Sequence, residues 1–213
     1  VLGMGTAMTV GATSVHPEVE SITLVEIEPG VAAAARTFHE ANHDVLDHPK
    51  LNVVWDDGRN WLLTTRERYD VITAEPSNPW IAGIANLYTR EFYQVIKSKI
   101  KDDGIFAQWF HNYSMSPDDF RMLFRPFVEA FPHVSLWSMK ESDFLLIGSK
   151  QEHPFDYAAV KKIYDNNWML RSDLDYLGLS DIYAVQGFYR MGKENLLNFS
   201  KGADINTDDG AQL

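Results

Sequence analysis

The chain has 213 residues, of which 45% are hydrophobic and 13% aromatic, so it can bury the core of one large domain. Its formal net charge of −11 repels phosphate backbones and attracts cations, so we expect no nucleic acid partner. The absence of cysteine excludes disulfides and thiolate zinc sites. No apolar run is long enough to span a bilayer, so we expect a soluble segment that makes no membrane contact.

Both ends of the chain resemble cuts within a longer protein. The apolar pair Val1-Leu2 stands directly before Gly3, whereas a first strand normally has about five residues. The chain stops after Leu213 without a terminal signal. We therefore expect a longer parent protein, truncated here at both ends, and we expect the polar residues 204–209 to be a solvated end.

Short β-rich runs alternate with helical patterns, which is typical of βαβ units and a parallel sheet. The runs predict strands at residues 1–2, 21–25, 51–55, 69–74 and 104–109. Helices are predicted at residues 29–39, at 59–64 and from Pro117 onward, where Ser116 is the expected N-cap. Each of these boundaries follows from local pattern alone.

The C-terminal half changes character after the helix that begins at Pro117. Residues 133–139 and 143–149 have no helix between them, so they predict an antiparallel pair that closes the sheet at its edge. The clearest later helix is predicted at residues 154–166. We therefore predict a single α/β domain over residues 1–213, with a Rossmann-like core at 1–150 and a mostly helical part at 151–213.

Small residues follow the first predicted strand. Gly3 and Gly5, with Thr6 beside them, stand between a strand and a helix, where small residues let the backbone approach a ligand. Met8 occupies the last glycine position of the dinucleotide fingerprint, so a tight structural turn is the alternative.

Acidic residues end the next two predicted strands. Glu26 lies about twenty residues after the glycine turn at Gly3 and Gly5, where a carboxylate can accept hydrogen bonds from both ribose hydroxyls. Its neighbour Ile27 is a further candidate for nucleoside contact. Asp57 and Gly58 follow the third strand and are placed to meet an adenine amino group, with a helix N-cap as the alternative role of Asp57.

Three strand ends that present small or acidic residues resemble the adenosyl-binding half of the Rossmann-like S-adenosylmethionine-dependent methyltransferase fold. That fold implies a mainly parallel, twisted sheet with a closing antiparallel strand. NAD binding by the same fingerprint is the alternative, and the closing antiparallel pair favours the methyltransferase type.

A carboxylate, Glu75, follows the apolar strand at residues 69–74 on the loop Glu-Pro-Ser-Asn-Pro-Trp. Ligands of parallel sheets bind outside the carboxyl ends of the strands, so Glu75 is the candidate catalytic residue. Asn78 and Trp80 on the same loop are candidates for substrate binding, and loop packing is the alternative for Trp80.

Three further polar side chains lie at or just after the end of the strand at residues 104–109. Gln108 is a candidate for substrate binding, His111 for proton transfer and Tyr113 for hydrogen-bond donation, with ordinary loop hydrogen bonding as the alternative for each. The histidines show no metal-ligand spacing, so we propose no metal from the sequence.

Four segments resemble the spermidine synthase family of polyamine aminopropyltransferases. They are residues 16–29, 56–62, 69–72 and 86–93, in the order and with the spacing of that family, and the resemblance covers about residues 1–150. The loop variant Glu-Pro-Ser-Asn-Pro-Trp is most similar to bacterial spermidine-synthase-like domains, some of which are fused to membrane-spanning segments.

The resemblance implies aminopropyl transfer from decarboxylated S-adenosylmethionine to a small-molecule amine, with release of methylthioadenosine. It also implies a cytoplasmic homodimer without a metal. Glu75 takes the place of the family's basic aspartate, and Asn78 that of an aspartate that binds the substrate amine. Thr6 replaces the aspartate that binds the aminopropyl ammonium group, so the amine-binding side departs from the family more than the adenosyl side.

Two alternatives stay open. The first is a methyltransferase that uses S-adenosylmethionine, because Thr6 no longer requires the amine of the decarboxylated donor. The second is a non-catalytic nucleoside-binding module, the soluble domain of a membrane-anchored parent.

Overall fold

The computed structural model describes residues 1–81, 83–140 and 142–210. Its contacts divide the chain into two compact units. Unit 1 comprises Val1–Gly58 and Pro154–Gly187, and unit 2 comprises Arg59–His153 and Phe188–Leu213. The division after Gly58 falls within the core predicted at residues 1–150, and neither this division nor the return of the chain to unit 2 at Phe188 has a counterpart in the sequence prediction.

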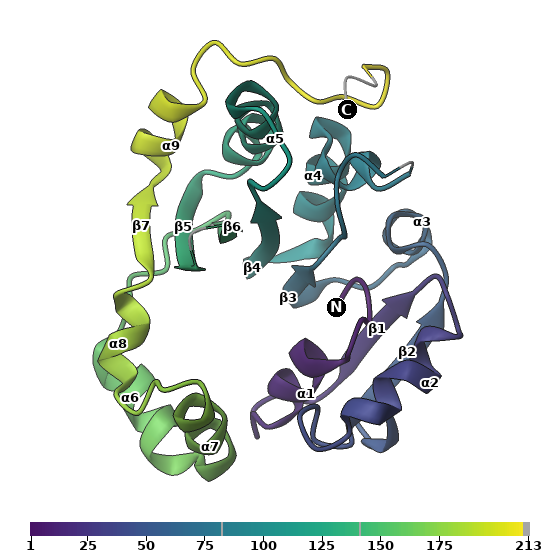
Figure 1. The fold of residues 1–213 in the computed structure, drawn as a ribbon, viewed down its shortest axis with the longest axis vertical. Coiled ribbons are helices and arrows are strands. Elements are labelled where there is room, and N and C mark those ends of the chain that lie inside the picture. Colours follow the sequence, from purple (N-terminus) through teal and green to yellow (C-terminus); the bar gives the residue numbers. More distant parts are fainter. Residues whose placement is uncertain (82, 141, 211–213) are drawn as a thin grey trace. The chain divides into compact units, whose positions relative to one another are not determined.

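Unit 1 is built on two parallel strands, β1 (Ile22–Glu26) and β2 (Leu51–Trp55), in a register that places Glu26 opposite Trp55. The first predicted strand is present as a single parallel bridge between Leu2 and Val25. Helices α1 (Met8–Ser14) and α2 (Val31–Ala35) lie along these strands in Figure 1, and the short 3₁₀ turns η1 (Arg36–Phe38) and η2 (Val45–Asp47) follow. Their apolar faces bury one core cluster: Met4, Ala7, Val10, Ile22, Leu24, Ala35 and Val45.

The second part of unit 1 is helical, as predicted. It consists of α6 (Tyr157–Asn166), α7 (Trp168–Tyr176) and α8 (Ile182–Gln186). Each helix has a side-chain cap: Asp156, Asn167 and Asp181 accept hydrogen bonds from backbone N–H groups of the first turn. Asn167 also donates to the Val15 carbonyl oxygen at 2.8 Å, which ties α7 to the end of α1.

Unit 2 contains a five-stranded sheet in the order β3-β4-β6-β5-β7. The strands are β3 (Tyr69–Ala74), β4 (Ile100–His111), β5 (His133–Lys140), β6 (Asp143–Ser149) and β7 (Tyr189–Gly192). β3 and β4 are parallel, and the remaining neighbours are antiparallel. Together with the parallel pair of unit 1, this confirms the predicted α/β class with a closing antiparallel part.

Two details of the predicted sheet were wrong. The pair β5 and β6 does not form the edge, because β6 lies between β4 and β5, and β7 borders β5 on its other side (Figure 1). The sequence analysis missed β7 because Tyr189–Gly192 is four residues long and stands within a segment that reads as helical. β4 is also longer than the predicted run at residues 104–109.

The helices of unit 2 enclose an aromatic core. They are α3 (Gly58–Thr64), which begins at the last residue of unit 1, η3 (Ala85–Tyr88), α4 (Arg90–Lys99), α5 (Pro117–Ala130) and α9 (Lys193–Phe199). The predicted start of α5 is confirmed, with a reciprocal capping box between Ser116 and Asp119. The largest fully buried rings are Tyr88, Phe92, Tyr93, Phe106, Phe110, Phe124, Phe127 and Phe131. No helix of the described ranges has the length and apolar character needed to cross a membrane.

The last described residues are only partly the solvated end that the sequence predicted: Asp204, Asp208 and Asp209 are exposed, but the segment is held against unit 2. Asn206 is buried, and its side chain donates to the Ala85 carbonyl oxygen at 3.2 Å. Asp208 accepts from Arg59 Nη1 and from Thr89 Oγ1, at 2.8 and 2.7 Å. Residues 203–210 therefore form a C-terminal strap across η3 and the start of α4, because a charge-assisted, bidentate pair is more favourable than a hydrated carboxylate at this position.

Candidate active site

The turn after Leu2 in unit 1 has the backbone geometry that the glycines predicted. Gly3 and Gly5 have φ angles of 92° and 49°, in the left-handed region that favours glycine. The Gly3 N–H donates to the Val25 carbonyl oxygen at 2.9 Å, which fixes the turn at the end of β1. An open backbone without side chains is what a nucleoside needs for close approach.

Glu26 links this turn to the end of β1. Its side chain is only 8% exposed; Oε2 accepts from the Met4 N–H at 2.7 Å and Oε1 from the Glu28 N–H at 2.9 Å. A carboxylate offers about four lone-pair positions, so two remain for a ligand diol. The sequence analysis missed this structural role, which holds Glu26 in a fixed orientation, and its predicted contact with ribose stays a prediction.

The other predicted donor-binding residues of unit 1 lie around the same strand end. The Asp56 N–H donates to the Glu26 carbonyl oxygen at 3.1 Å, which places Asp57 and Gly58 beside the end of β1. Asp57 is exposed, and Ile27 is 69% exposed, an unusual position for an isoleucine and one available to a ligand. Thr6 is half-buried, and its carbonyl oxygen accepts from Asn42. The structure thus gathers the predicted donor residues, whose individual contacts stay predictions.

Glu75 begins the loop after β3 in unit 2, as predicted. The carboxylate residue is exposed, whereas Pro76 and Pro79 of the same loop are buried. Asn78 lies partly buried between the prolines, and its Oδ1 accepts a hydrogen bond from the Tyr113 hydroxyl at 3.3 Å. The prolines restrict the loop backbone, so Glu75 is presented at the strand end on a stiff support.

Three rings form an aromatic cluster beside this loop. The His111 and Tyr113 rings are stacked, with centroids 3.8 Å apart and planes at 13°. The Trp80 ring meets both edge-on, with centroids 5.2 Å from His111 and 6.3 Å from Tyr113. Trp80 is 40% exposed. Loop packing, the alternative given for Trp80, is therefore present, and its predicted substrate contact stays a prediction.

His111 does not make the ordinary loop hydrogen bonds that the sequence suggested as an alternative. It is 2% exposed, and neither ring nitrogen has a hydrogen-bond partner among the described residues. Burial lowers the pKa of His111 below its usual value, and the opposing influences of the Tyr113 backbone and the Asp143 carboxylate do not reverse this. An unpaired buried polar group costs about 1–3 kcal/mol of folding free energy, so burial of the unpaired His111 imidazole lowers the stability of the fold.

Gln108 lies deeper than the sequence analysis expected. Its side chain is fully buried, and its Nε2 donates to the Leu87 carbonyl oxygen at 2.9 Å. This bond holds η3, the turn that follows the Glu75 loop. Gln108 thus has a clear structural role, and its predicted contact with substrate stays a prediction.

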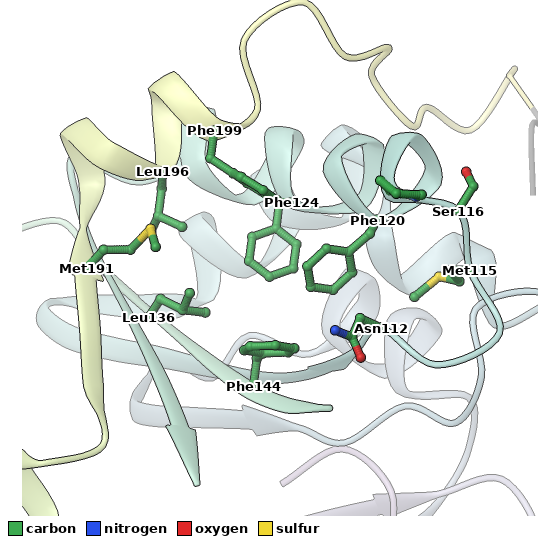
Figure 2. Close-up of a pocket in the computed structure, with 11 residues that line it drawn as sticks. Asn112, Met115, Ser116, Phe120, Phe124, Leu136, Phe144, Met191, Leu196 and Phe199 are labelled. Carbon is green, nitrogen blue, oxygen red and sulfur yellow. The ribbon is translucent and has the colours of Figure 1, made fainter. Parts of the chain in front are cut away.

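No metal site accompanies these residues in the part of the chain that the structure describes, since no group of three or more histidine or carboxylate side chains is arranged to hold an ion. A separate apolar cavity of about 380 Å³ lies between α5, α9 and the antiparallel strands of unit 2 (Figure 2). Phe120, Phe124, Phe144, Leu136 and Met191 point into it, and none of the predicted site residues lines it.

The mainly parallel strands with a closing antiparallel part are features of the methyltransferase-type α/β fold that the sequence predicted. Residues 3–139 match the spermine/spermidine synthase domain, so the chain belongs to the spermine/spermidine synthase family. This confirms the resemblance found in the sequence.

Curated relatives agree with the family match. A polyamine aminopropyltransferase of Bacillus subtilis is 29% identical over 160 residues, which cover 72% of this chain and 58% of the relative. Polyamine aminopropyltransferase 1 of Streptomyces coelicolor is 33% identical over 107 residues, or 49% of this chain and 20% of the relative. The chain therefore spans 58% of the length of the Bacillus relative that it matches.

Solved structures share the fold. The spermidine synthase of Thermotoga maritima has a TM-score of 0.67 at 22% identity, over 87% of this chain and 66% of that one. A probable spermidine synthase of Corynebacterium glutamicum has a TM-score of 0.68 at 20% identity, over 100% and 72%. Human methyltransferase-like protein 13, in complex with SAH, has a TM-score of 0.60 at 17% identity, over 82% and 80%. The predicted methyltransferase-type fold is thus confirmed.

Proposed function

We propose that the protein transfers an aminopropyl group from decarboxylated S-adenosylmethionine to a small amine, with Glu75 as the general base. In this reaction the amine lone pair attacks the aminopropyl carbon bound to sulfur. The carbon–sulfur bond breaks, its electron pair returns to sulfur, and neutral methylthioadenosine leaves. The amine attacks in its unprotonated form, and the new ammonium group then gives a proton to the Glu75 carboxylate, which becomes a carboxylic acid.

The observation that carries this proposal is the position of Glu75. It follows Ala74 directly at the carboxyl end of β3, in a chain that belongs to the spermine/spermidine synthase family. Ligands of open α/β sheets bind at this end of the strands. The curated relatives named polyamine aminopropyltransferases support the same reaction class.

The donor has supporting residues of its own in unit 1. Gly3 and Gly5 leave room for its backbone contacts, and the remaining lone pairs of Glu26 suit the ribose hydroxyls. Asp57 would meet the adenine, with Ile27 and Gly58 beside it. Thr6 would lie near the aminopropyl group, where its neutral side chain binds an ammonium less strongly than a carboxylate does.

The acceptor side has a different balance of charge. Asn78 is neutral, and its Oδ1 already accepts from Tyr113, so Glu75 is the main candidate for holding a cationic amine there. Trp80 supplies an aromatic face that suits an ammonium or its alkyl chain. We therefore propose a small amine as the acceptor, bound by Glu75, Asn78 and Trp80, with Gln108 beneath them.

Calorimetry and product analysis test the proposal together. The protein is titrated with decarboxylated S-adenosylmethionine, S-adenosylmethionine and methylthioadenosine, and turnover is followed with a panel of amines. We expect the decarboxylated donor to bind most tightly and methylthioadenosine to be released only when an amine is present. Tighter binding of S-adenosylmethionine, with a homocysteine-type product, would overturn aminopropyl transfer.

A methyltransferase is the second candidate, favoured by Thr6 in place of the family's aspartate. It differs from the first in its product, S-adenosylhomocysteine, which the same assay detects. Binding of the nucleosides without turnover supports the third possibility, a nucleoside-binding module of a membrane-anchored parent.

We further propose that the protein acts in the cytoplasm as a homodimer, without a metal and without a nucleic acid partner. The family resemblance supports the dimer and the location, and the net charge of −11 argues against nucleic acid. Analytical ultracentrifugation gives the oligomeric state directly, and a monomer across the micromolar range would contradict the dimer.

A further inference from the structure

The imidazole of His111 is the one described histidine side chain whose two ring nitrogens are both buried and unpaired. Buried polar groups in folded proteins almost always have a partner, and an exception calls for a ligand, an ion or a water. Neutral imidazole has one N–H donor and one acceptor nitrogen, so the unpaired atoms of His111 include an acceptor nitrogen that lacks a hydrogen-bond donor.

His111 lies at the same sheet edge as Glu75. β3 and β4 are parallel, and Ala74 of β3 is opposite Gln108 of β4. Glu75 directly follows Ala74, and His111 ends β4 three residues beyond Gln108. The loop that starts at Glu75 also contacts His111, because the Trp80 ring on this loop meets the His111 ring edge-on, with the ring centroids 5.2 Å apart.

Two other polar groups nearby already accept hydrogen bonds from neighbouring side chains. The Asn78 oxygen already accepts from the Tyr113 hydroxyl. The Asp143 carboxylate, opposite His111 on β6, accepts from the Trp109 indole N–H at 3.2 Å. Among the described residues, two buried acceptors near the end of β4 have no hydrogen-bond partner, Gln108 Oε1 and the His111 imidazole. Gln108 is held by its bond to the Leu87 carbonyl oxygen, whereas His111 lies at the end of β4 in contact with Trp80 of the Glu75 loop.

We propose that His111 accepts a hydrogen bond from the attacking nitrogen of the acceptor and thereby makes a primary amine the preferred acceptor. This inference rests on the proposed aminopropyl transfer. A primary amine has two N–H groups: one faces Glu75, which takes its proton, and the other donates to His111. The lone pair is then directed at the aminopropyl carbon. A secondary amine has a single N–H group and leaves one of the two acceptors unpaired.

The chemistry of the site agrees with this assignment. The lowered pKa of His111 keeps the imidazole neutral near pH 7, so an acceptor nitrogen is present. Trp80 is 40% exposed, so the ring that contacts His111 is itself accessible to a ligand from solvent.

The test compares a primary amine with its N-methyl derivative by the rate of methylthioadenosine release. In the wild type we expect kcat/KM to favour the primary amine by about tenfold, the size of one hydrogen bond to a buried acceptor. His111→Phe keeps the ring that stacks on Tyr113 but removes both nitrogens. It should lower kcat/KM for the primary amine about tenfold and leave that for the secondary amine within about twofold.

Three controls make the outcome decisive. His111→Gln restores an acceptor oxygen and should recover part of the preference for the primary amine. This variant also tests the proposal if His111→Phe folds poorly. His133→Phe, at an exposed histidine that begins β5, should leave the preference unchanged. Donor binding by calorimetry shows that each variant is folded.

The two levels of proposal fail differently. If His111→Phe turns over with the wild-type preference for the primary amine, the role of His111 is wrong and aminopropyl transfer stands. If the wild type releases no methylthioadenosine with any amine, aminopropyl transfer is wrong, and the role of His111 falls with it.

Discussion

In unit 1 the Glu26 carboxylate accepts hydrogen bonds from two backbone N–H groups, whereas in unit 2 the His111 imidazole is buried with neither nitrogen paired among the described residues. The residues proposed for donor binding, called the donor side below, are therefore held by backbone hydrogen bonds of unit 1. The residues proposed for acceptor binding, called the acceptor side below, are held by ring packing in unit 2.

The largest effect should come from the acceptor side. Glu75→Gln keeps the shape of the side chain but removes its basicity, so we expect the transfer rate to fall about 10²–10⁴-fold. Donor affinity should change by less than about twofold, because donor and acceptor residues make separate contacts. Methylthioadenosine release and calorimetry measure the two quantities. Glu67→Gln, at an exposed carboxylate before β3, is the matched control. Wild-type activity in Glu75→Gln would remove this residue from the mechanism.

A substitution on the donor side should lower both the affinity for the donor and the free energy of unfolding. Glu26→Ala leaves the Met4 and Glu28 N–H groups without their acceptor, and hydrogen bonds to charged groups contribute about 1.5–3 kcal/mol each. We expect donor affinity to fall at least about tenfold and the free energy of unfolding to fall by about 3–6 kcal/mol.

Urea unfolding and calorimetry measure both changes. Glu28→Ala is the control, because the Glu28 carboxylate accepts only from the exposed Gly30 N–H and should affect stability by less than about 0.5 kcal/mol. Unchanged nucleoside affinity in Glu26→Ala would contradict the donor-site assignment and with it the contrast between the two sides.

The C-terminal strap should have a smaller effect that depends on pH. Hydrogen bonding to Arg59 lowers the pKa of Asp208 below its ordinary value of 3.8, so the folded state prefers the ionised carboxylate. The stabilisation is then present above about pH 4 and is lost as the pH falls through the lowered pKa. Asp208→Asn should reduce the free energy of unfolding by about 1 kcal/mol at pH 7 and by less at pH 3.

Urea unfolding of the variant and the wild type at the two pH values checks this expectation. Asp118→Asn is the matched control, since its pair with Arg121 involves a carboxylate whose side chain is 87% exposed and should contribute little. An equal loss for Asp208→Asn at both pH values would show that the charge of Asp208 does not hold the strap.

Local chemistry explains which parts of this molecule were predictable from the sequence. The N-cap at Ser116, the glycine turn and the carboxylate after β3 each depend on residues close together in the chain, and each is present as predicted. The edge position of the antiparallel pair was wrong because strand order depends on β7, which returns from residue 189. Local pattern contains no information about such a distant partner.

The same limit applied within the site. The sequence placed Glu26 and His111 at strand ends. It did not show that the Glu26 carboxylate accepts hydrogen bonds from two backbone N–H groups, or that the His111 imidazole is buried without a partner among the described residues. The attachment of residues 204–209 was not predicted for a related reason, because Arg59 lies far from Asp208 in the chain. Polar side chains acquire their roles from partners that only the fold supplies.

The smallest expected effect separates packing from hydrogen bonding on the acceptor side. Tyr113→Phe keeps the ring that stacks on His111 and removes the hydroxyl that donates to Asn78 at 3.3 Å. We expect the free energy of unfolding to change by less than about 0.5 kcal/mol and KM for the amine to change about two- to threefold, because this bond is long and partly exposed. Tyr113→Ala removes the ring as well and should weaken amine binding further. Equal kinetics of the two variants would show that ring packing does not organise the acceptor side.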